Sequence, residues 1–319
     1  MNKVLEKIQK LGIVPVVVLN TVEDAEPLAK ALCEGGLPVA EVTFRTDAAE
    51  ESIRIMKEKF PDMLVGAGTV LTTGQVDRAV SAGAEFIVSP GFNPTVVEYC
   101  IKKDIPVAPG CSCPSDMERA LELGLEVVKF FPAEACGGLK AIKAMAAPYV
   151  NLKFMPTGGI NAKNINEYLA FPKIIACGGS WMVSSDLVKN KDFAQITALT
   201  KEAVMTVHGF ELKHVGINCT SEEEANKTTD LFDSVFGFTK KPGNSSIFAG
   251  TYIEAMKTPY LGAKGHIAIG TNNIQRSISY LEALCIEVDM ETASYKDGVL
   301  RAVYLKEEVS GFALHLLQK

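Results

Sequence analysis

The sequence predicts an α/β fold: a (β/α)8 barrel of the TIM type, followed by a smaller α+β domain of paired βαβββ modules. Two observations predict the barrel. Between residues 13 and 180, about eight short β-rich runs start roughly 20 to 27 residues apart, and amphipathic stretches separate them. A third observation, the change to short strands and hairpin turns after residue 209, predicts the second domain. We therefore expect domains at residues 1–209 and 210–319.

The eight runs are short, apolar and rich in β-branched residues. They are IVPVVV, VAEVTF, LVGAGTV, FIVSPG, PVAPGC, EVVKFFP, KFMPTGG and IIACGGS, starting at Ile13, Val39, Leu64, Phe86, Pro106, Glu126, Lys153 and Ile174. Helices are expected at residues 21–35, 47–60, 73–83 and 115–124, where apolar residues recur every three or four positions. A doubly wound open sheet would show the same alternation, but no GxGxxG follows the first run, so the barrel is preferred.

Composition narrows the functional class. The chain has 319 residues, a formal net charge of -6 and no basic run, which gives no electrostatic case for binding nucleic acid or an anionic membrane. Its eight cysteines are scattered, and Cys111 and Cys113 form the only close pair. Without a second pair at zinc spacing or a small-domain framework, this pattern favours reduced thiols over a zinc site or disulfides. Residues 1–12 read as an amphipathic helix, not a signal peptide, and no later run is long enough to span a bilayer. We expect a soluble cytoplasmic protein.

Lys129 lies inside the apolar run that begins at Glu126. Alternation along a strand puts Val127, Lys129 and Phe131 on one face, and so apolar a strand is expected to be buried. A buried ammonium is costly unless it is paired or loses its proton, and a neutral amine can attack a ketone to form an imine. The alternative is a lysine that reaches water from the strand end or meets a carboxylate.

Polar residues collect at the predicted carboxyl ends of the strands, where barrel enzymes carry their active sites. In the second run, Glu41, Thr43 and Arg45 share one face by the two-residue period. Thr69 ends the third run, and Pro90 follows the fourth. Alternatively, Glu41 and Arg45 form a simple ion pair at the barrel mouth, and the threonines are ordinary strand residues.

Glycine pairs follow the seventh and eighth runs. Thr157 precedes Gly158 and Gly159, and Gly179 precedes Ser180. Converging backbone amides at these two positions are the usual phosphate site of the barrel fold, although an isolated glycine pair can be only a tight turn.

The absence of histidine before residue 208 limits the chemistry of the barrel. A zinc aldolase with histidine ligands is disfavoured, and a carboxylate-bound magnesium enzyme would need more inward acidic residues than Glu41. One lysine, one carboxylate, one arginine, two threonines and a phosphate site fit imine catalysis on a phosphorylated 2-oxo acid.

Six motifs carry a family resemblance over about residues 1–208. EVTFRT, GAGTV, SPG, VKFFPAE, PTGGI and GGSW are similar, in order and spacing, to the class I 2-keto-3-deoxy-6-phosphogluconate (KDPG) and 4-hydroxy-2-oxoglutarate aldolases of the Entner–Doudoroff type. The RT after EVT and the FFPAE after the lysine favour this branch over the phosphogalactonate aldolases, which stay an alternative. The resemblance implies cleavage to pyruvate and glyceraldehyde 3-phosphate, no cofactor for the aldolase, and trimers.

The resemblance also implies roles for individual residues. Lys129 would form the Schiff base and Glu41 would be the general acid/base. Three residues would hold the pyruvyl carboxylate: Arg45, Thr69 and Thr157. Phe131 and Pro90 would shape the pocket, and the phosphate would be bound by Gly158, Gly159, Gly179 and Ser180. The alternative function is not that of an aldolase: the barrel would be a sugar-phosphate-binding module, and the chemistry would lie in a metal-dependent second domain.

The segment after residue 209 contains a weak internal repeat. ELKHVGINC from Glu211 precedes a helical stretch at 221–236, and GAKGHIAIG from Gly262 precedes another at 272–284, each followed by short strands. This duplication resembles the glyoxalase/bleomycin-resistance (vicinal oxygen chelate) fold; a plain repeated α+β domain, or a module for assembly or regulation, is the alternative.

The second resemblance implies a divalent metal held by four residues, His214, Glu254, His266 and His315. The last position usually carries glutamate in that family, so His315 is a departure. Three histidines and one carboxylate suit zinc, nickel or iron(II) better than magnesium. The alternative is a set of histidines on exposed strand faces.

Overall fold

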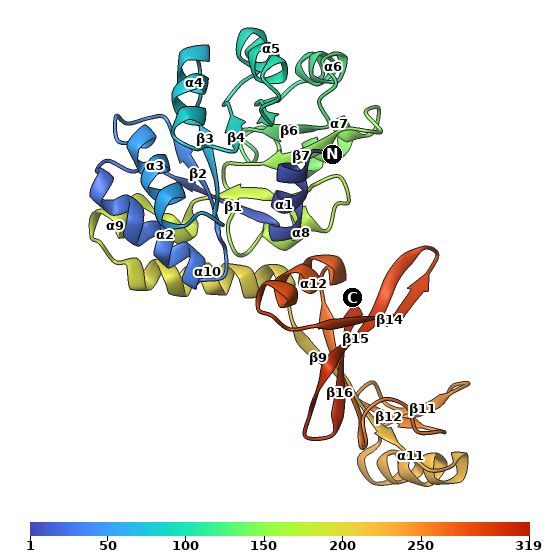
Figure 1. The fold of residues 1–319 in the computed structure, drawn as a ribbon. Helices are drawn as coiled ribbons and strands as arrows, with labels where there is room; N and C mark the ends of the chain where they lie inside the picture. Colours follow the sequence, from blue (N-terminus) through green and yellow to red (C-terminus); the bar gives the residue numbers. More distant parts are fainter. The chain divides into compact units, whose positions relative to one another are not determined.

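The computed structural model describes residues 1–319 (Figure 1). The chain forms two compact units, Met1–Val207 and His208–Lys319. The first unit alternates strands with helices. Its eight strands each lie within one of the predicted runs and are β1 (Ile13–Val17), β2 (Val39–Thr43), β3 (Leu64–Gly68), β4 (Phe86–Val88), β5 (Val107–Ala108), β6 (Val127–Phe130), β7 (Lys153–Pro156) and β8 (Cys177–Gly179).

These strands form a curled parallel sheet. Six of them pair in the order β5-β4-β3-β2-β1-β8, and β6 pairs with β7. Isolated parallel bridges connect the two sets at Gly110–Lys129, Phe154–Ile174 and Thr157–Gly178. Every pairing is parallel, so the carboxyl ends of the strands lie at the same edge, where the predicted polar residues gather.

The helices of the first unit pack apolar stripes against the sheet and keep charged residues outside. In α3, for example, Ile53 and Met56 are buried while Lys57 and Lys59 are not. The helical elements are α1 (Lys3–Leu11), η1 (Val22–Asp24), α2 (Ala25–Glu34), α3 (Ala49–Lys59), α4 (Thr73–Ser81), α5 (Pro94–Lys102), α6 (Pro114–Glu122), α7 (Gly138–Ala146), α8 (Ile165–Leu169), η2 (Trp181–Val183), α9 (Ser185–Lys189) and α10 (Phe193–His208). None of the helices has both the length and the apolar character needed to cross a bilayer.

The interior of the first unit is tightly filled. All residues of β2 and β3 are buried, as expected for parallel strands covered on both faces. A β-carbon on Gly66 would lie 2.3 Å from the ring of Phe86, so the glycine makes room for an aromatic ring from the neighbouring strand.

The second unit repeats one element order twice. The first copy is β9 (Glu211–Asn218), α11 (Glu222–Phe236), β10 (Lys240–Pro242), β11 (Ser246–Ala249) and β12 (Ile253–Met256). The second copy is β13 (Gly265–Thr271), α12 (Ile274–Ala283), β14 (Val288–Lys296), β15 (Val299–Val309) and β16 (Phe312–Gln318). The eight strands form one mixed sheet in the order β10-β11-β12-β9-β13-β16-β15-β14, and the copies meet where β9 and β13 pair antiparallel.

Candidate active site

Lys129 and Glu41 form a buried pair inside the first unit. The lysine Nζ lies 2.9 Å from Oε1 and 3.3 Å from Oε2 of the glutamate. The residues are 5% and 1% exposed, so little water screens the two charges. The buried lysine is therefore paired with a carboxylate and does not reach water. A proton can pass between the two groups at this distance.

The strands fix both members of the pair. The backbone carbonyl of Lys129 accepts a hydrogen bond from the Cys111 N–H (2.7 Å), and its backbone N–H donates to the Pro109 carbonyl (2.9 Å). These two bonds anchor β6 beside the end of β5. Glu41 lies opposite Gly66 in the β2–β3 register. The Lys129 Nζ is also 5.5 Å from the centre of the Phe131 ring, which gives it a second favourable contact.

Thr43 lies within β2 two residues after Glu41, as expected, but Arg45 lies beyond the strand and does not share its face. β2 ends at Thr43, whose hydroxyl donates to the Val17 carbonyl at 2.9 Å and so connects two strands. Arg45 lies in the turn beyond the strand, where its Nε donates to the Thr69 hydroxyl at 3.3 Å. Thr69 has a φ of 56°, which is rare and strained for a β-branched residue.

A pocket of about 310 Å³ is lined by neighbours of the Lys129–Glu41 pair, but neither Lys129 nor Glu41 lines it. Val16, in its wall, is opposite Glu41 in the β1–β2 register, and the Phe131 ring, also in its wall, faces the Lys129 Nζ. Seven predicted residues line the pocket: Arg45, Phe131, Thr157, Gly158, Gly159, Gly179 and Ser180. The remaining lining residues were not among the predicted ones: Val16, Val18, Ile160, Gly178, Val183, Ser184 and Ser185. The predicted carboxylate-holding and phosphate-binding residues therefore border one space, with the exception of Thr69, which reaches it through Arg45.

Thr157 carries an unpartnered polar group at the pocket wall. The residue is 6% exposed and its hydroxyl has no hydrogen-bond partner in the structure. A β-carbon on Gly178 would lie 2.3 Å from this hydroxyl, so the glycine leaves the space that it occupies. Buried hydroxyls normally have partners, and a bound oxyanion would supply one here.

Pro90 does not line the pocket. It follows β4, and a β-carbon on Gly110 would lie 2.0 Å from the Pro90 carbonyl oxygen, so the two backbones are in close contact. Gly110 forms a parallel β-bridge with Lys129, so Pro90 supports the strand that carries the lysine through Gly110. The direct role of Pro90 in shaping the pocket stays a prediction.

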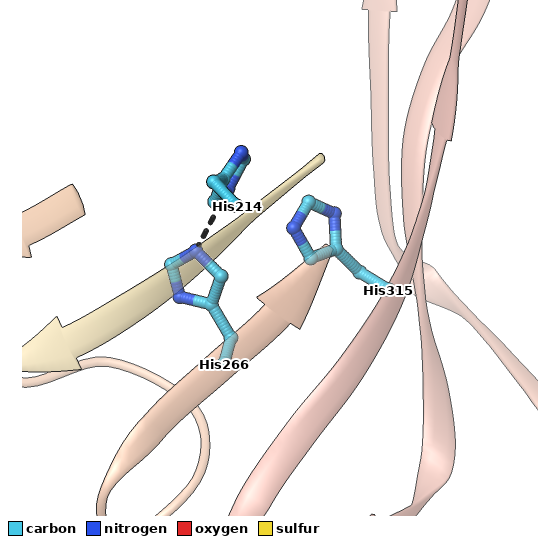
Figure 2. Close-up of side chains that lie close together, drawn as sticks. All are labelled: His214, His266 and His315. Atoms are coloured by element: carbon cyan, nitrogen blue, oxygen red, sulfur yellow. Dashed lines mark hydrogen bonds between the residues drawn. The ribbon is translucent and has the colours of Figure 1, made fainter. Parts of the chain in front are cut away.

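In the second unit, the three predicted histidines and Glu254 form a cluster. Figure 2 shows the rings of His214, His266 and His315 turned toward one another. The Nε2 atoms of His214 and His266 are 3.2 Å apart, and each lies 3.1 Å from Oε2 of Glu254. These residues come from β9, β13, β16 and β12, so both copies of the repeat contribute, and the histidines are not on exposed strand faces.

Charge in this cluster is concentrated on Glu254. Burial alone raises the pKa of its carboxyl group, but hydrogen bonds from His214, His266 and Ser246 outweigh burial and hold the pKa well below its usual range. Burial, and then the neighbouring rings of His266 and His214, lower the pKa of His315 to about 4, although Glu254 acts in the opposite direction. The cluster therefore offers an anionic oxygen and a neutral imidazole at neutral pH.

The donor set fits a divalent cation. Both ring nitrogens of His315 are buried without a partner, and a cation held by the cluster would supply one for the nitrogen that faces it. Two donors bound to one cation at about 2.1 Å lie about 3.0 to 3.4 Å apart, which matches the spacing of the His214, His266 and Glu254 atoms. Gly216 is required beside them, because a β-carbon there would lie 2.0 Å from the His266 ring.

Comparison with known proteins assigns the first unit. A family model described as KDPG and KHG aldolase matches residues 4–199. A 2-dehydro-3-deoxy-phosphogluconate aldolase of Treponema pallidum is 48% identical over 207 residues, covering 65% of this chain and 99% of the relative. The enzyme of the same name from Haemophilus influenzae is 48% identical, covering 64% of this chain and 96% of the relative.

Solved structures agree with these relatives. The KDPG aldolase of Legionella pneumophila, with pyruvate captured as a covalent carbinolamine, is 40% identical with a TM-score of 0.61, covering 63% of this chain and 98% of that one. The 2-keto-3-deoxy-6-phosphogluconate aldolase of Zymomonas mobilis with 3-phosphoglycerate is 44% identical with a TM-score of 0.60, covering 63% and 94%. The family match covers more than half of this chain, which belongs to the KDPG and KHG aldolase family and is a carbon–carbon lyase.

Proposed function

We propose that the first unit cleaves 2-dehydro-3-deoxy-6-phosphogluconate to pyruvate and glyceraldehyde 3-phosphate through a Schiff base on Lys129. The same site would cleave 4-hydroxy-2-oxoglutarate to pyruvate and glyoxylate, because both substrates share the pyruvyl half. The observation that carries this proposal is the contact of 2.9 Å between the buried Lys129 Nζ and Glu41, beside a pocket lined by Arg45, Thr157 and the glycine pairs.

The proposed mechanism uses Glu41 in each proton transfer. Passing a proton to the Glu41 carboxylate leaves the Lys129 nitrogen with a free electron pair, which attacks the C2 carbonyl to give a carbinolamine. Glu41 then gives its proton to the leaving hydroxyl, so that loss of water yields the protonated imine and restores the carboxylate. Glu41 next removes the C4 hydroxyl proton, the C3–C4 bond breaks, and its electrons flow into the imine to leave an enamine. Glyceraldehyde 3-phosphate leaves, Glu41 passes the proton taken from the C4 hydroxyl to C3 of the enamine, and addition of water to the resulting imine releases pyruvate and the free amine.

The binding roles follow the position of each residue around the pocket. Arg45, Thr69 and Thr157 would hold the pyruvyl carboxylate, which gives the Thr157 hydroxyl the partner it lacks. Gly158, Gly159, Gly179 and Ser180 would hold the phosphate. The pyruvate carbinolamine of the Legionella enzyme and the 3-phosphoglycerate bound to the Zymomonas enzyme support a covalent lysine and a phosphate-accepting pocket.

We assign the gluconate-derived epimer as the preferred substrate. The relatives named for phosphogluconate are 48% identical to this chain, whereas a solved KDPGal structure is 25% identical. An assay of pyruvate release from the gluconate- and galactonate-derived epimers tests this assignment. Faster turnover of the galactonate epimer would reverse it.

The mechanism itself is tested by trapping. Borohydride added with pyruvate should reduce the imine and attach a stable adduct to Lys129, located by mass spectrometry of the digested protein. Lys129→Ala should give no adduct and essentially no cleavage, whereas Glu41→Gln should still form the adduct but turn over roughly 10²-fold or more slowly. An unmodified wild-type lysine would refute the mechanism.

We infer further that the curled sheet is a closed (β/α)8 barrel, which the three isolated bridges between its two strand sets support. The barrel units would assemble as trimers. Light scattering on the full chain measures the mass directly, and a monomeric mass would refute the assembly.

For the second unit we propose a divalent metal site of the vicinal oxygen chelate type, held by His214, Glu254, His266 and His315. The repeated element order and the convergence of these donors support it. Zinc, nickel or iron(II) would polarise a ligand oxygen there. Metal analysis of protein purified without an affinity tag should find about one ion per chain, and the variant His214→Ala with His266→Ala should hold none.

A further inference from the structure

The loops after β6 and β7 are joined by their backbones. The Ala133 N–H donates to the Thr157 carbonyl at 2.8 Å, and the Glu134 N–H donates to the Gly158 carbonyl at 3.1 Å. The first loop continues from the strand that carries Lys129, and the second contains the glycine pair that lines the pocket. The position of the glycine pair therefore depends on the loop that follows the lysine strand.

Glu134 fills the space beside the second of these glycines. A β-carbon on Gly159 would lie 2.4 Å from Cγ of Glu134, so the glutamate side chain occupies the volume that a side chain at position 159 would need. Gly159 also has a φ of +83°, a backbone conformation that glycine adopts without strain. The Gly159 carbonyl also accepts hydrogen bonds from the side-chain amides of Asn161 (3.2 Å) and Asn164 (3.1 Å), so the Glu134 contact restricts the loop from the opposite side of the glycine.

A buried tyrosine holds the carboxylate of Glu134. Tyr168, on α8, is 2% exposed, and its hydroxyl donates to Oε1 of Glu134. Burial, and then the hydrogen bond to Glu134, raises the pKa of Tyr168, while a hydrogen bond from the Leu139 N–H acts in the opposite direction. The hydroxyl therefore keeps its proton and remains a donor, and it fixes the rotamer of a glutamate that is otherwise exposed.

We infer that Tyr168 and Glu134 are positioning residues that hold the Gly158–Gly159 loop in the conformation that binds a phosphoryl group. The pair thereby determines how strongly the enzyme prefers a phosphorylated 2-oxo acid over one without phosphate. This inference rests on the proposed function, which assigns the glycine pair to the phosphate. Neither side chain lines the pocket, and both act through Gly159.

The test compares two substrates in the full chain. KM and kcat are measured with 2-dehydro-3-deoxy-6-phosphogluconate and with 4-hydroxy-2-oxoglutarate for wild type, Tyr168→Phe and Glu134→Gln. Tyr99→Phe is the matched control, because the Tyr99 hydroxyl also donates to a carboxylate, that of Asp77 at 2.7 Å, on an exposed face of the same unit. The inhibition constant for inorganic phosphate gives a second readout.

Tyr168→Phe should raise KM for the phosphorylated substrate roughly tenfold or more, the loss expected for one charge-assisted hydrogen bond. The inhibition constant for phosphate should rise by a similar factor. Both kcat values, and KM for 4-hydroxy-2-oxoglutarate, should stay within about twofold of wild type. Glu134→Gln should show a smaller effect of the same kind, because its amide oxygen still accepts the hydrogen bond, and Tyr99→Phe should show none.

Equal losses on both substrates, or no loss on either, would overturn the inference. A variant that no longer forms the pyruvate–borohydride adduct would also overturn it, because the pair would then support the whole fold. The proposed function fails separately: wild type would then show no preference for the phosphorylated substrate and no inhibition by phosphate. Wild type with both properties, and variants that keep them, would refute the positioning role alone.

Discussion

A β-carbon on Gly68 would lie 2.2 Å from Oε1 of Glu41, so the glycine that ends β3 provides the space for the carboxylate that faces Lys129. The two residues come from neighbouring strands, and Thr43 is opposite Gly68 in their register. The position of the carboxylate is therefore determined by the absence of a side chain on the next strand as much as by β2 itself.

Gly68→Ala should displace the Glu41 carboxylate without removing it. We expect kcat to fall roughly 10²-fold, because the general base no longer lies within reach of its proton, while the pyruvate adduct on Lys129 still forms. Gly74→Ala is the control, since a β-carbon there would meet only the Thr72 hydroxyl at 4.0 Å. Full activity of Gly68→Ala would show that Glu41 tolerates the shift.

Lys129→Met should destabilise the first unit by about 3 kcal/mol, because it leaves the Glu41 charge buried and unpaired. Adding Glu41→Gln should recover much of this loss. Trp181, the only tryptophan, lies in the first unit and reports its unfolding by fluorescence. Lys30→Met, which removes an exposed pair with Glu34, should cost under about 1 kcal/mol. Equal losses for the two lysine variants would contradict the buried-pair argument.

Thr157→Val should separate binding from stability. Replacing the unpartnered hydroxyl by a methyl group should leave the unfolding free energy unchanged or raise it by up to about 1 kcal/mol. The same change should raise KM roughly tenfold for both 2-oxo acid substrates, since both carry the pyruvyl carboxylate. Chemical denaturation followed by Trp181 fluorescence and steady-state kinetics measure the two effects. A loss of stability without a change in KM would indicate a structural hydroxyl.

Ser246→Ala should weaken metal binding in the second unit. The Ser246 hydroxyl donates to Oε1 of Glu254 at 2.6 Å, which leaves Oε2 to face His214 and His266. Losing such an outer contact typically costs about 10- to 100-fold in metal affinity. Competition with a chelator measures the affinity, and Ser245→Ala, at an exposed neighbour, is the control. Unchanged affinity would mean that Glu254 needs no such support.

The second unit should lose stability in mild acid. Burial, and then the charge of Arg276, lowers the pKa of His208 to about 4, while the unfolded residue keeps its ordinary value of 6.5. Between these two values the unfolded chain binds a proton at His208 and the folded chain does not. The free energy of unfolding therefore falls as the pH drops from 6.5 toward 4. The loss is on the order of 3 kcal/mol for this residue. Calorimetry across this range should show a smaller loss for His208→Gln, and an identical profile would exclude His208.

Local sequence patterns predicted the strand runs and Lys129 because they depend on nearby residues. Strand periodicity, the lone lysine in an apolar run and the glycine pairs at strand ends are all visible within short windows. The same reasoning put Arg45 on a strand face, but β2 ends at Thr43, where the Arg45 N–H bonds back to the Thr43 carbonyl at 2.8 Å and the chain turns out of the strand.

The missed features depend on residues that are distant in the sequence. Glu134 and Tyr168 are ordinary residues until the loop after β6 meets α8, and Ser184 and Ser185 reach the pocket only because β8 closes against β1. No spacing within the chain indicates that Gly68 makes room for Glu41. Such contacts become visible only when the strands are paired.

The antiparallel pairing of β9 with β13 makes each half of the second unit chemically incomplete. His214 and Glu254 belong to the first copy, and His266 and His315 to the second, so a single copy presents only two of the four donors. Losing or exchanging either copy would therefore dismantle the shared cluster, and neither half can supply it alone.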